Sequence, residues 1–204
     1  MKLFGSLTSP FVRAVRIAAI ELGIADQIEL VETVVKPAAP NHSFGKAVNP
    51  IRRVPALQTA SGANVIDSRV IIEFLNDHAD GNLIASHPDK RLVCLNRHAI
   101  AAGGTEALVQ AMYEKNIRPA ATYWADNYAD QLDKAASALD WAETNATEIG
   151  LAFDLGAIGF VAMIEYAQFR FADIDWVERR PAVADLLTEW RTRESVTKTL
   201  PPSQ

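Results

Sequence analysis

Two short polar motifs stand where a strand is expected to end and a helix to begin. The first is Ser9-Pro10, which precedes an apolar helical pattern, and the second is Asp67-Ser68. Serine and aspartate commonly cap a helix from this position, and proline is favoured at the first helical residue. The amide groups at a helix start also favour an anion. Both motifs therefore predict helix caps, and both are candidate sites for an anionic ligand.

The Asp67-Ser68 pair has a second chemical meaning. Helix amides and the Ser68 hydroxyl together suit a carboxylate, while the Asp67 carboxylate beside them suits an ammonium group. A carboxylate and an ammonium side by side make up the head group of an amino acid. The pair therefore predicts a site for such a head group, with a simple helix cap as the alternative.

A third motif, Arg53-Val54-Pro55, lies directly before an expected strand. Proline cannot donate a hydrogen bond to a neighbouring strand, and in this position it often marks a special backbone geometry. With a cis Val54–Pro55 bond, the amide and carbonyl of Val54 could face the backbone of a ligand. Most bonds of this kind are trans, so spacing alone favours trans. Arg52 and Arg53 are by default surface charges.

The segments around these motifs alternate in type over residues 1–78. The pattern predicts β-α-β-(irregular)-β-β-α, with strands at 1–5, 28–35, 54–58 and 64–66, helices at 10–22 and 68–78, and an irregular stretch at 36–49. Helical spacing dominates the remainder, at 90–117, 122–146, 154–171 and 182–190. The sequence therefore predicts a small α/β domain of residues 1–78, a linker of residues 79–86 and an all-helical domain of residues 87–204.

Composition narrows the class of protein. The 204 residues carry 20 Lys and Arg against 25 Asp and Glu, a net charge of −5, and 49% are hydrophobic. These proportions are typical of a globular protein, and the acidic balance argues against a nucleic-acid partner. No apolar stretch reaches the ~18 residues of a membrane span. Cys94 is the only cysteine, and the histidines lack zinc spacing, so we expect a cytoplasmic protein with no metal.

Taken in this order, the three motifs resemble those of the glutathione S-transferase family. The segment from Ser9 to Arg16 resembles the S-P-F/Y-x-x-x-V-R signature of its serine-type members. The segment from Arg53 to Leu57 is similar to the family's K-V-P-x-L segment, and Asp67-Ser68 to its E/D-S pair. The C-terminal run from Arg193 to Pro202 is similar to a little-characterised bacterial branch. The resemblance covers essentially the whole chain and implies a thioredoxin-like domain followed by the family's all-helical domain.

The resemblance also implies how glutathione is held as a co-substrate. Ser68 and the helix amides would bind the γ-glutamyl carboxylate, with Asp67 near the amino group. The backbone of Val54, before a cis Pro55, would pair with the cysteinyl backbone. Arg53 stands where the family has Lys or Gln and would reach the glycyl carboxylate.

The activity that the resemblance implies is the transfer of glutathione to a small electrophile, a detoxification reaction. Ser9 would donate a hydrogen bond to the glutathione thiolate, with Thr8 and Ser6 as rival hydroxyls, and Phe11 counts among the glutathione-binding residues. A non-catalytic binding or regulatory protein of the same fold is the alternative. A reductase or peroxidase is disfavoured because Ser9 stands where glutaredoxin-like relatives have a cysteine. Isomerisation of a glutathione adduct stays open.

The helical domain is expected to supply the wall of the electrophile site. The candidates are Tyr113, Arg118 and Trp124, although aromatic residues at helical spacing more often belong to a core. The resemblance also implies a homodimer.

The helix over 154–171 is expected to have a weakened start. The family often has a capping residue three positions before the acid at this helix start, and Leu151, which holds that position before Asp154, cannot cap.

Overall fold

The computed structural model describes residues 1–202, which form two compact units. The first unit comprises Met1–Ile84 together with the C-terminal segment that begins at Glu194, and the second comprises Ala85–Arg193. This division differs from the expected one at the C-terminal end, which the sequence analysis placed in the helical domain.

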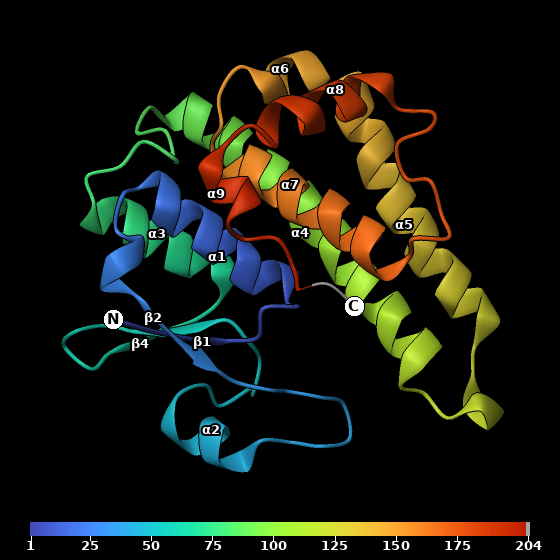
Figure 1. Cartoon of the computed structure of the whole chain (residues 1–204), viewed down its shortest axis with the longest axis horizontal. Coiled ribbons are helices and arrows are strands. Elements are labelled where there is room, and N and C mark those ends of the chain that lie inside the picture. The colour runs from blue at the N-terminus through green and yellow to red at the C-terminus, as the bar shows by residue number, and fades with distance from the viewer. Residues whose placement is uncertain (203–204) are drawn as a thin grey trace. The chain divides into compact units, whose positions relative to one another are not determined.

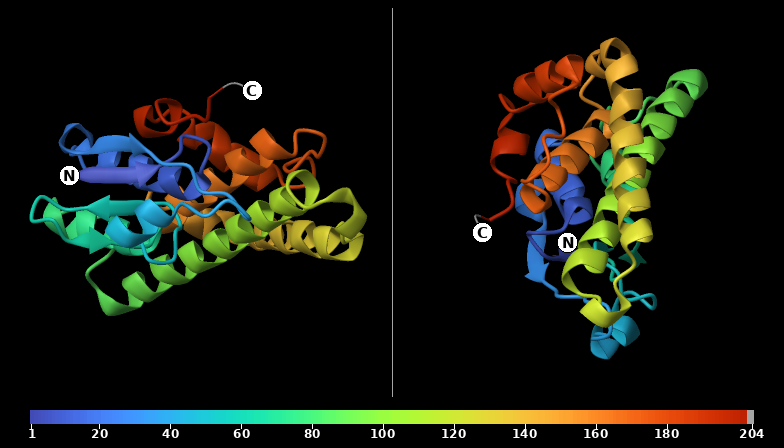
Figure 2. Two further views of the ribbon diagram at one scale, coloured as in Figure 1. Left: turned by 90° about the horizontal axis from the view of Figure 1, so that it is seen from below. Right: turned by 90° about the vertical axis from the view of Figure 1, so that its right-hand side faces the viewer.

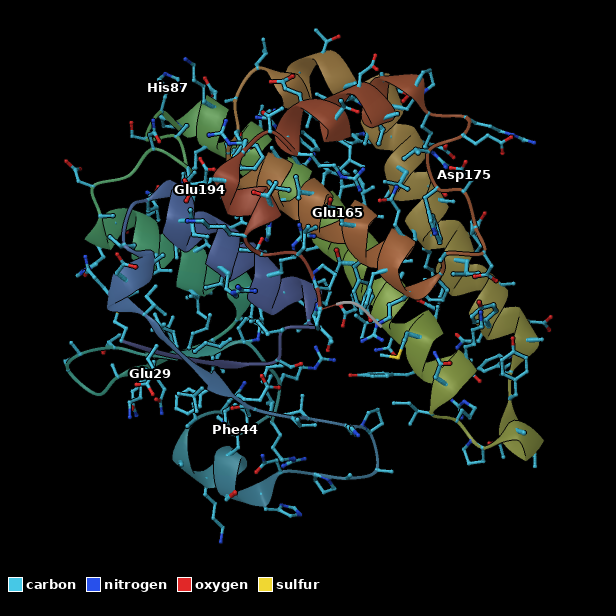
Figure 3. The ribbon with its side chains drawn as sticks, viewed as in Figure 1. Glu29, Phe44, His87, Glu165, Asp175 and Glu194 are labelled. Carbon is cyan, nitrogen blue, oxygen red and sulfur yellow. The ribbon has the colours of Figure 1, made fainter. Side chains whose placement is uncertain are left out.

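The C-terminal segment belongs to the first unit because its buried residues pack on an early helix, α1 (Pro10–Glu21). Val196 and Thr199 are fully buried, and the Arg13 guanidinium of α1 donates to the Val196 carbonyl and to Thr199 Oγ1, each at 3.3 Å. The contact joins residues about 185 positions apart, so no local pattern in the sequence could predict it. Figure 3 labels Glu194 where the short helix α9 (Glu194–Thr197) begins.

The first unit is built on a four-stranded sheet in the order β2-β1-β3-β4. Strand β1 runs parallel to β2 and antiparallel to β3, which pairs antiparallel with β4. Figure 1 shows α1 and α3 on one face of the sheet and α2 on the other. The bounds are β1 Lys2–Gly5, β2 Glu29–Glu32, β3 Ala56–Gln58, β4 Asn64–Val65, α2 His42–Ala47 and α3 Ser68–His78, with a single 3₁₀ turn at Ala25–Gln27.

Strand β1 lies very close to α1 because Gly5 has no side chain. A Cβ at this position would come within 2.3 Å of the Val12 side chain. Leu3, which faces the same way along the strand, is 2% exposed and belongs to the core between the sheet and the helices. The close approach fixes where the chain leaves β1 and enters α1.

The expectation of an irregular stretch over 36–49 was wrong for part of it, because α2 lies there. Asn41 caps this helix by accepting the Phe44 amide at 3.1 Å. Phe44 is buried on the side that faces the sheet (Figure 3), where its ring lies 5.9 Å from the Phe4 ring. A six-residue helix with one buried side chain is too short to show a helical spacing of apolar residues in the sequence. Gly45 within it also lowers the helical propensity.

The second unit is a bundle in which α7 is the central helix. Residues Leu155–Ala167 of α7 are all buried, and α4 and α5 run side by side in it (Figure 2). Gly104 of α4 permits close packing, since a Cβ there would come within 2.4 Å of the Met163 side chain. The bounds are α4 Pro88–Asn116, α5 Ala125–Thr144, α6 Ala146–Gly150, α7 Leu155–Arg170 and α8 Pro181–Trp190, with a 3₁₀ turn at Ala120–Thr122.

The start of α7 corrects the expectation of a weakened cap. Asp154 is itself the capping residue, and its Oδ1 accepts the Gly156 and Ala157 amides at 2.9 and 3.1 Å. Its Oδ2 accepts from the buried Arg97 at 2.8 Å, and Arg97 also donates to the Glu148 carbonyl at 2.7 Å. Leu151 therefore has no part in the cap, and its side chain is exposed.

Over residues 1–202, none of the helices combines the length and the apolar character that crossing a bilayer requires. Within the same range, no group of three or more His, Cys, Asp or Glu side chains is arranged to hold a metal ion.

Candidate functional site

The register of the sheet brings the three sequence motifs to one edge of the first unit. Phe4 pairs with Ala56, so the end of β1 lies beside the start of β3. Leu57 pairs with Val65, so the end of β4 lies at the same edge. The Ser9, Val54–Pro55 and Asp67-Ser68 motifs directly follow or precede these strand ends. Segments separated by more than fifty residues are thereby grouped around one edge.

At the start of α1, the cap leaves donors without a protein partner. Ser9 Oγ accepts the Val12 amide at 3.3 Å, and its carbonyl accepts the Arg13 amide at 3.0 Å. Pro10 carries no N–H. Within residues 1–202, the Phe11 amide and the Ser9 hydroxyl hydrogen therefore have no protein acceptor, and the half-buried Ser9 can donate outward.

The rival hydroxyls of the same loop contact each other. Ser6 Oγ and Thr8 Oγ1 are 3.0 Å apart, and Ser6 Oγ also accepts the Thr8 amide at 3.3 Å. One of the two hydroxyl hydrogens is used within the pair. Ser9 is the hydroxyl of this loop that acts only as an acceptor toward the described protein atoms, which favours it as a donor to a ligand.

At the start of α3, both members of the Asp67-Ser68 pair keep polar atoms that the described protein does not use. Asp67 caps the helix through one oxygen, Oδ1, which accepts the Arg69 and Val70 amides at 3.1 and 3.4 Å. Its second oxygen takes no part in the cap, so capping and binding are compatible. The Ser68 side chain is buried, and among residues 1–202 neither its hydroxyl nor its amide has a hydrogen-bond partner.

The segment before β3 contains the cis Val54–Pro55 bond that the family resemblance implied and that spacing alone disfavoured. Pro55 is buried, Val54 is half-buried and Arg53 is exposed. A second cis bond, Ile66–Asp67, precedes α3. The structure thus has special backbone geometry at two of the three motifs.

Asn49 organises this segment, a role that the sequence analysis did not assign. It is 1% exposed, and its Nδ2 donates to the Arg53 carbonyl at 2.7 Å while its Oδ1 accepts the Ile51 amide at 3.1 Å. The Asn49 carbonyl also accepts the Arg52 amide at 2.8 Å. An Asn-Pro pair is a turn signal, and that signal could have pointed to it.

The electrophile-site candidates lie in the second unit, where α4 ends and α5 begins. Tyr113 is half-buried, Arg118 is exposed and Trp124 is 61% exposed, so Trp124 is not the core residue that helical spacing favours. The buried Glu114, which the sequence analysis missed, joins two of them. It accepts the Trp124 amide at 2.8 Å and forms an ion pair with Arg118 Nε at 2.7 Å.

The electrostatics of Glu114 follow from these contacts. The amide of Trp124 contributes most to holding the pKa of Glu114 below its ordinary value, with Arg118 and Asn127 acting in the same direction. Burial opposes them. The carboxylate is therefore ionised throughout the neutral range.

Cys94 is the single cysteine of the sequence, and it lies in the core of the second unit. Burial raises the pKa of its thiol to about 11, and the charge of Asp154 adds to this effect. A thiol that stays protonated is a poor nucleophile. Cys94 is therefore structural, as its 1% exposure also indicates.

Comparison with known proteins identifies the family of this chain. The family described as "Glutathione S-transferase, N-terminal domain" matches residues 8–78. The uncharacterized GST-like protein YibF of Escherichia coli (strain K12) is 30% identical over 207 residues, which cover 99% of both chains. With a relative of this identity over its whole length, the chain belongs to the glutathione S-transferase family.

Solved structures share the complete fold. A glutathione transferase family member from Pseudomonas fluorescens Pf-5 with bound glutathione is 31% identical, with a TM-score of 0.95 and 99% of each chain covered. A structure from the same organism with bound S-(propanoic acid)-glutathione is 30% identical, with a TM-score of 0.91 and 100% of each chain covered. A glutathione S-transferase from Methylobacillus flagellatus KT with bound glutathione is 28% identical, with a TM-score of 0.86 over 98% of this chain and 99% of its own.

Proposed function

We propose that this protein is a glutathione transferase that activates the thiolate of glutathione by a hydrogen bond from Ser9. The observation that carries the proposal is the pair of helix starts, α1 and α3. Among residues 1–202, each keeps an amide N–H and a hydroxyl hydrogen without a protein acceptor at one sheet edge. The glutathione found in relatives of 28–31% identity supports the same ligand for this chain.

In the proposed binding mode, the α3 start takes the γ-glutamyl end of glutathione. The Ser68 hydroxyl and amide donate to its carboxylate, and Asp67 Oδ2 accepts from its ammonium group. The amide and carbonyl of Val54 pair with the cysteinyl backbone, and the exposed Arg53 binds the glycyl carboxylate. Asn49 contributes by fixing the Arg53 carbonyl, and through it the direction of Val54.

The donors at α1 are sufficient for thiolate formation. Lowering a thiol pKa by two units requires about 2.7 kcal/mol of preferential stabilisation of the charged form. A hydrogen bond to a charged group supplies about 1.5–3 kcal/mol, and a helix start adds about 0.3–1 kcal/mol. Ser9 would supply the former, and the Phe11 amide at the α1 start would assist. Ser9 then acts as a donor and neither attacks nor takes a proton.

The thiol proton would pass to solvent, and the thiolate sulfur would form a bond to a carbon of a small electrophile. In a substitution the displaced electron pair departs with the leaving group, and in an addition it goes to the neighbouring carbon, which then takes a proton from solvent. Tyr113, Arg118 and Trp124 are proposed to contact that electrophile. The S-(propanoic acid)-glutathione bound by a relative supports a site beside the sulfur that accepts a substituent.

We also propose a homodimer. Three apolar residues, Val70 of α3 and Leu92 and Val93 of α4, are exposed, and a second copy of the chain would cover them.

The decisive experiment is Ser9→Ala, measured for turnover and for glutathione binding together. We expect turnover with a reactive chloronitroarene to fall at least tenfold while glutathione affinity is largely kept, because the lost hydrogen bond acts on the thiolate. Thr8→Val and Ser6→Ala are the matched controls, with a smaller effect expected. Unchanged turnover in Ser9→Ala would remove Ser9 from the mechanism.

The alternative is a glutathione-binding protein without turnover, because the donors at α1 and α3 account for binding alone. Wild-type protein that binds glutathione but converts none of several electrophile classes would establish this alternative.

Light scattering at micromolar protein concentration tests the proposed homodimer. A mass equal to that of one chain would contradict it.

A further inference from the structure

The C-terminal segment of the first unit lies along α1, the helix that Ser9 caps. In the sequence, the whole second unit separates residues 194–202 from the rest of the first unit, yet α9 lies beside α1 (Figure 1). Three residues of the segment are almost completely buried, namely Ser195, Val196 and Thr199, which are 1%, 0% and 0% exposed. The segment is therefore part of the core of the unit that carries Ser9.

Arg13 joins this segment to the start of α1. Its amide donates to the Ser9 carbonyl at 3.0 Å, a main-chain hydrogen bond of the first helical turn. Arg13 is 3% exposed, and its side chain donates from Nε to Thr199 Oγ1 and from Nη2 to the Val196 carbonyl, each at 3.3 Å. A displacement of Arg13 would therefore reach Ser9 through a single turn of helix.

The acceptor for Arg13 is itself held in place. Thr199 Oγ1 donates to the Ser195 carbonyl at 2.7 Å, so its hydrogen is used and its lone pairs accept. Near the other end of the helix, the Ser195 hydroxyl donates to the carboxylate of Glu21, the last residue of α1. The segment therefore contacts α1 both near its first turn and at its last residue.

We propose that Thr199 is a positioning residue that acts through Arg13, so that the C-terminal segment holds Ser9 where thiolate activation requires it. This inference rests on the proposed function, in which Ser9 donates to the thiolate of glutathione. Catalytic groups need to be held within about 0.5 Å of the productive geometry. The buried contact between Arg13 and Thr199 supplies a fixed point one turn along the helix from Ser9.

The test measures the pKa of the thiol of bound glutathione, from the ultraviolet absorbance of the thiolate against pH, together with turnover. Thr199→Val keeps nearly the shape of the side chain but removes the acceptor for Arg13. We expect the thiol pKa to rise by about half a unit to one unit, because a misplaced Ser9 hydroxyl stabilises the thiolate less. At a pH below the thiol pKa, kcat should fall about threefold to tenfold, while glutathione affinity is largely kept.

The other variants also leave every protein charge unchanged, so a shift in the thiol pKa reports the position of Ser9 and not an altered field. Thr199→Ser keeps the hydroxyl and should restore a thiol pKa close to that of wild type. Ser195→Ala loses the contact with Glu21, farther from Ser9, and should raise the thiol pKa by a smaller amount.

Thr33→Val is the matched control for the loss of a buried hydroxyl. Thr33 is also buried in the first unit, but its hydroxyl donates to the Val31 carbonyl at 2.9 Å, within its own segment. This variant should leave the thiol pKa and kcat unchanged. A shift in Thr33→Val as large as that in Thr199→Val would overturn the positioning role.

The outcomes separate this inference from the proposed function. A thiol pKa that is lowered in the wild-type complex and is the same in Thr199→Val overturns the positioning role and leaves the proposed function standing, even if that variant melts at a lower temperature. No binding of glutathione to wild type, or a bound thiol with the pKa of free glutathione, overturns both. If Thr199→Val does not fold, Ser195→Ala decides, and an unchanged thiol pKa in that variant overturns the positioning role.

Discussion

Helix starts in the two units use the same local device in different surroundings. In the first unit, Ser9 and Asp67 cap α1 and α3 and lie at least partly open to solvent. In the second unit, Asp154 caps α7, is 9% exposed and gives its second oxygen to the buried Arg97. The caps of the first unit leave groups unpaired, whereas that of the second leaves none of its carboxylate oxygens unpaired. A cap thus keeps polar groups available to a ligand only where its neighbours leave it incomplete.

The physical reason is the cost of burying polar groups. An unpaired donor inside a core is expensive, so the bundle pairs Asp154 with Arg97 and with two amides. At the sheet edge, water or a ligand can complete the bonds, and the same donors cost little. Variants of the two kinds of cap should therefore differ in stability, in thiol reactivity and in glutathione binding.

Asp154→Ala should destabilise the protein much more than Asp67→Ala. The first change removes a cap and leaves the Arg97 charge buried without its partner, which costs about 3–5 kcal/mol. The second removes a cap at an exposed position, which costs about 1 kcal/mol. Urea unfolding without glutathione measures both, and Asp154→Asn, which keeps the capping oxygen, should fall between them. Equal losses for the two alanine variants would show that the surroundings of the caps do not matter.

Cys94, which lies against the α7 start, should be almost inert toward thiol reagents in the folded protein. With the pKa of its thiol raised to about 11, the reactive thiolate is scarce below that pH. Relative to an ordinary cysteine at pH ~8, the thiolate fraction falls about a hundredfold. The rate of reaction with a disulfide reagent should be measured from pH ~7 to ~10, with the urea-unfolded chain as the control. It should rise without a plateau in the folded protein, and rapid labelling at neutral pH would contradict the burial.

Ser68→Ala should weaken glutathione binding by about tenfold to a hundredfold, because it removes a hydroxyl that donates to a carboxylate in the proposed site. Calorimetry on the full chain gives the affinity. Ser43→Ala is the matched control, since Ser43 also lies at a helix start of the first unit but donates to Asn41 Oδ1. If both variants bind like wild type, the α3 start is only a cap, and the contrast with α7 disappears.

Local patterns in the sequence were enough for most of the elements. The helix predicted over 68–78 has those bounds in the structure, and the strands predicted at 54–58 and 64–66 are present as the antiparallel pair β3 and β4. These segments have a clear apolar period or a strong turn signal, and their caps are short-range contacts. The motifs at Ser9 and Asp67-Ser68 could be identified from the sequence because capping contacts join residues that are close together in the chain.

What the sequence could not show depended on contacts between distant residues. Arg97 completes the Asp154 cap across 57 positions, and Arg13 holds Thr199 across 186. Whether a capping group stays unpaired, whether Trp124 is exposed and whether Glu114 is buried all depend on which helices pack together. Burial and pairing are properties of the packed chain, because each requires a neighbour that local propensity does not choose. The residue types and helix starts follow from short-range chemistry, whereas their availability to a ligand follows from tertiary packing.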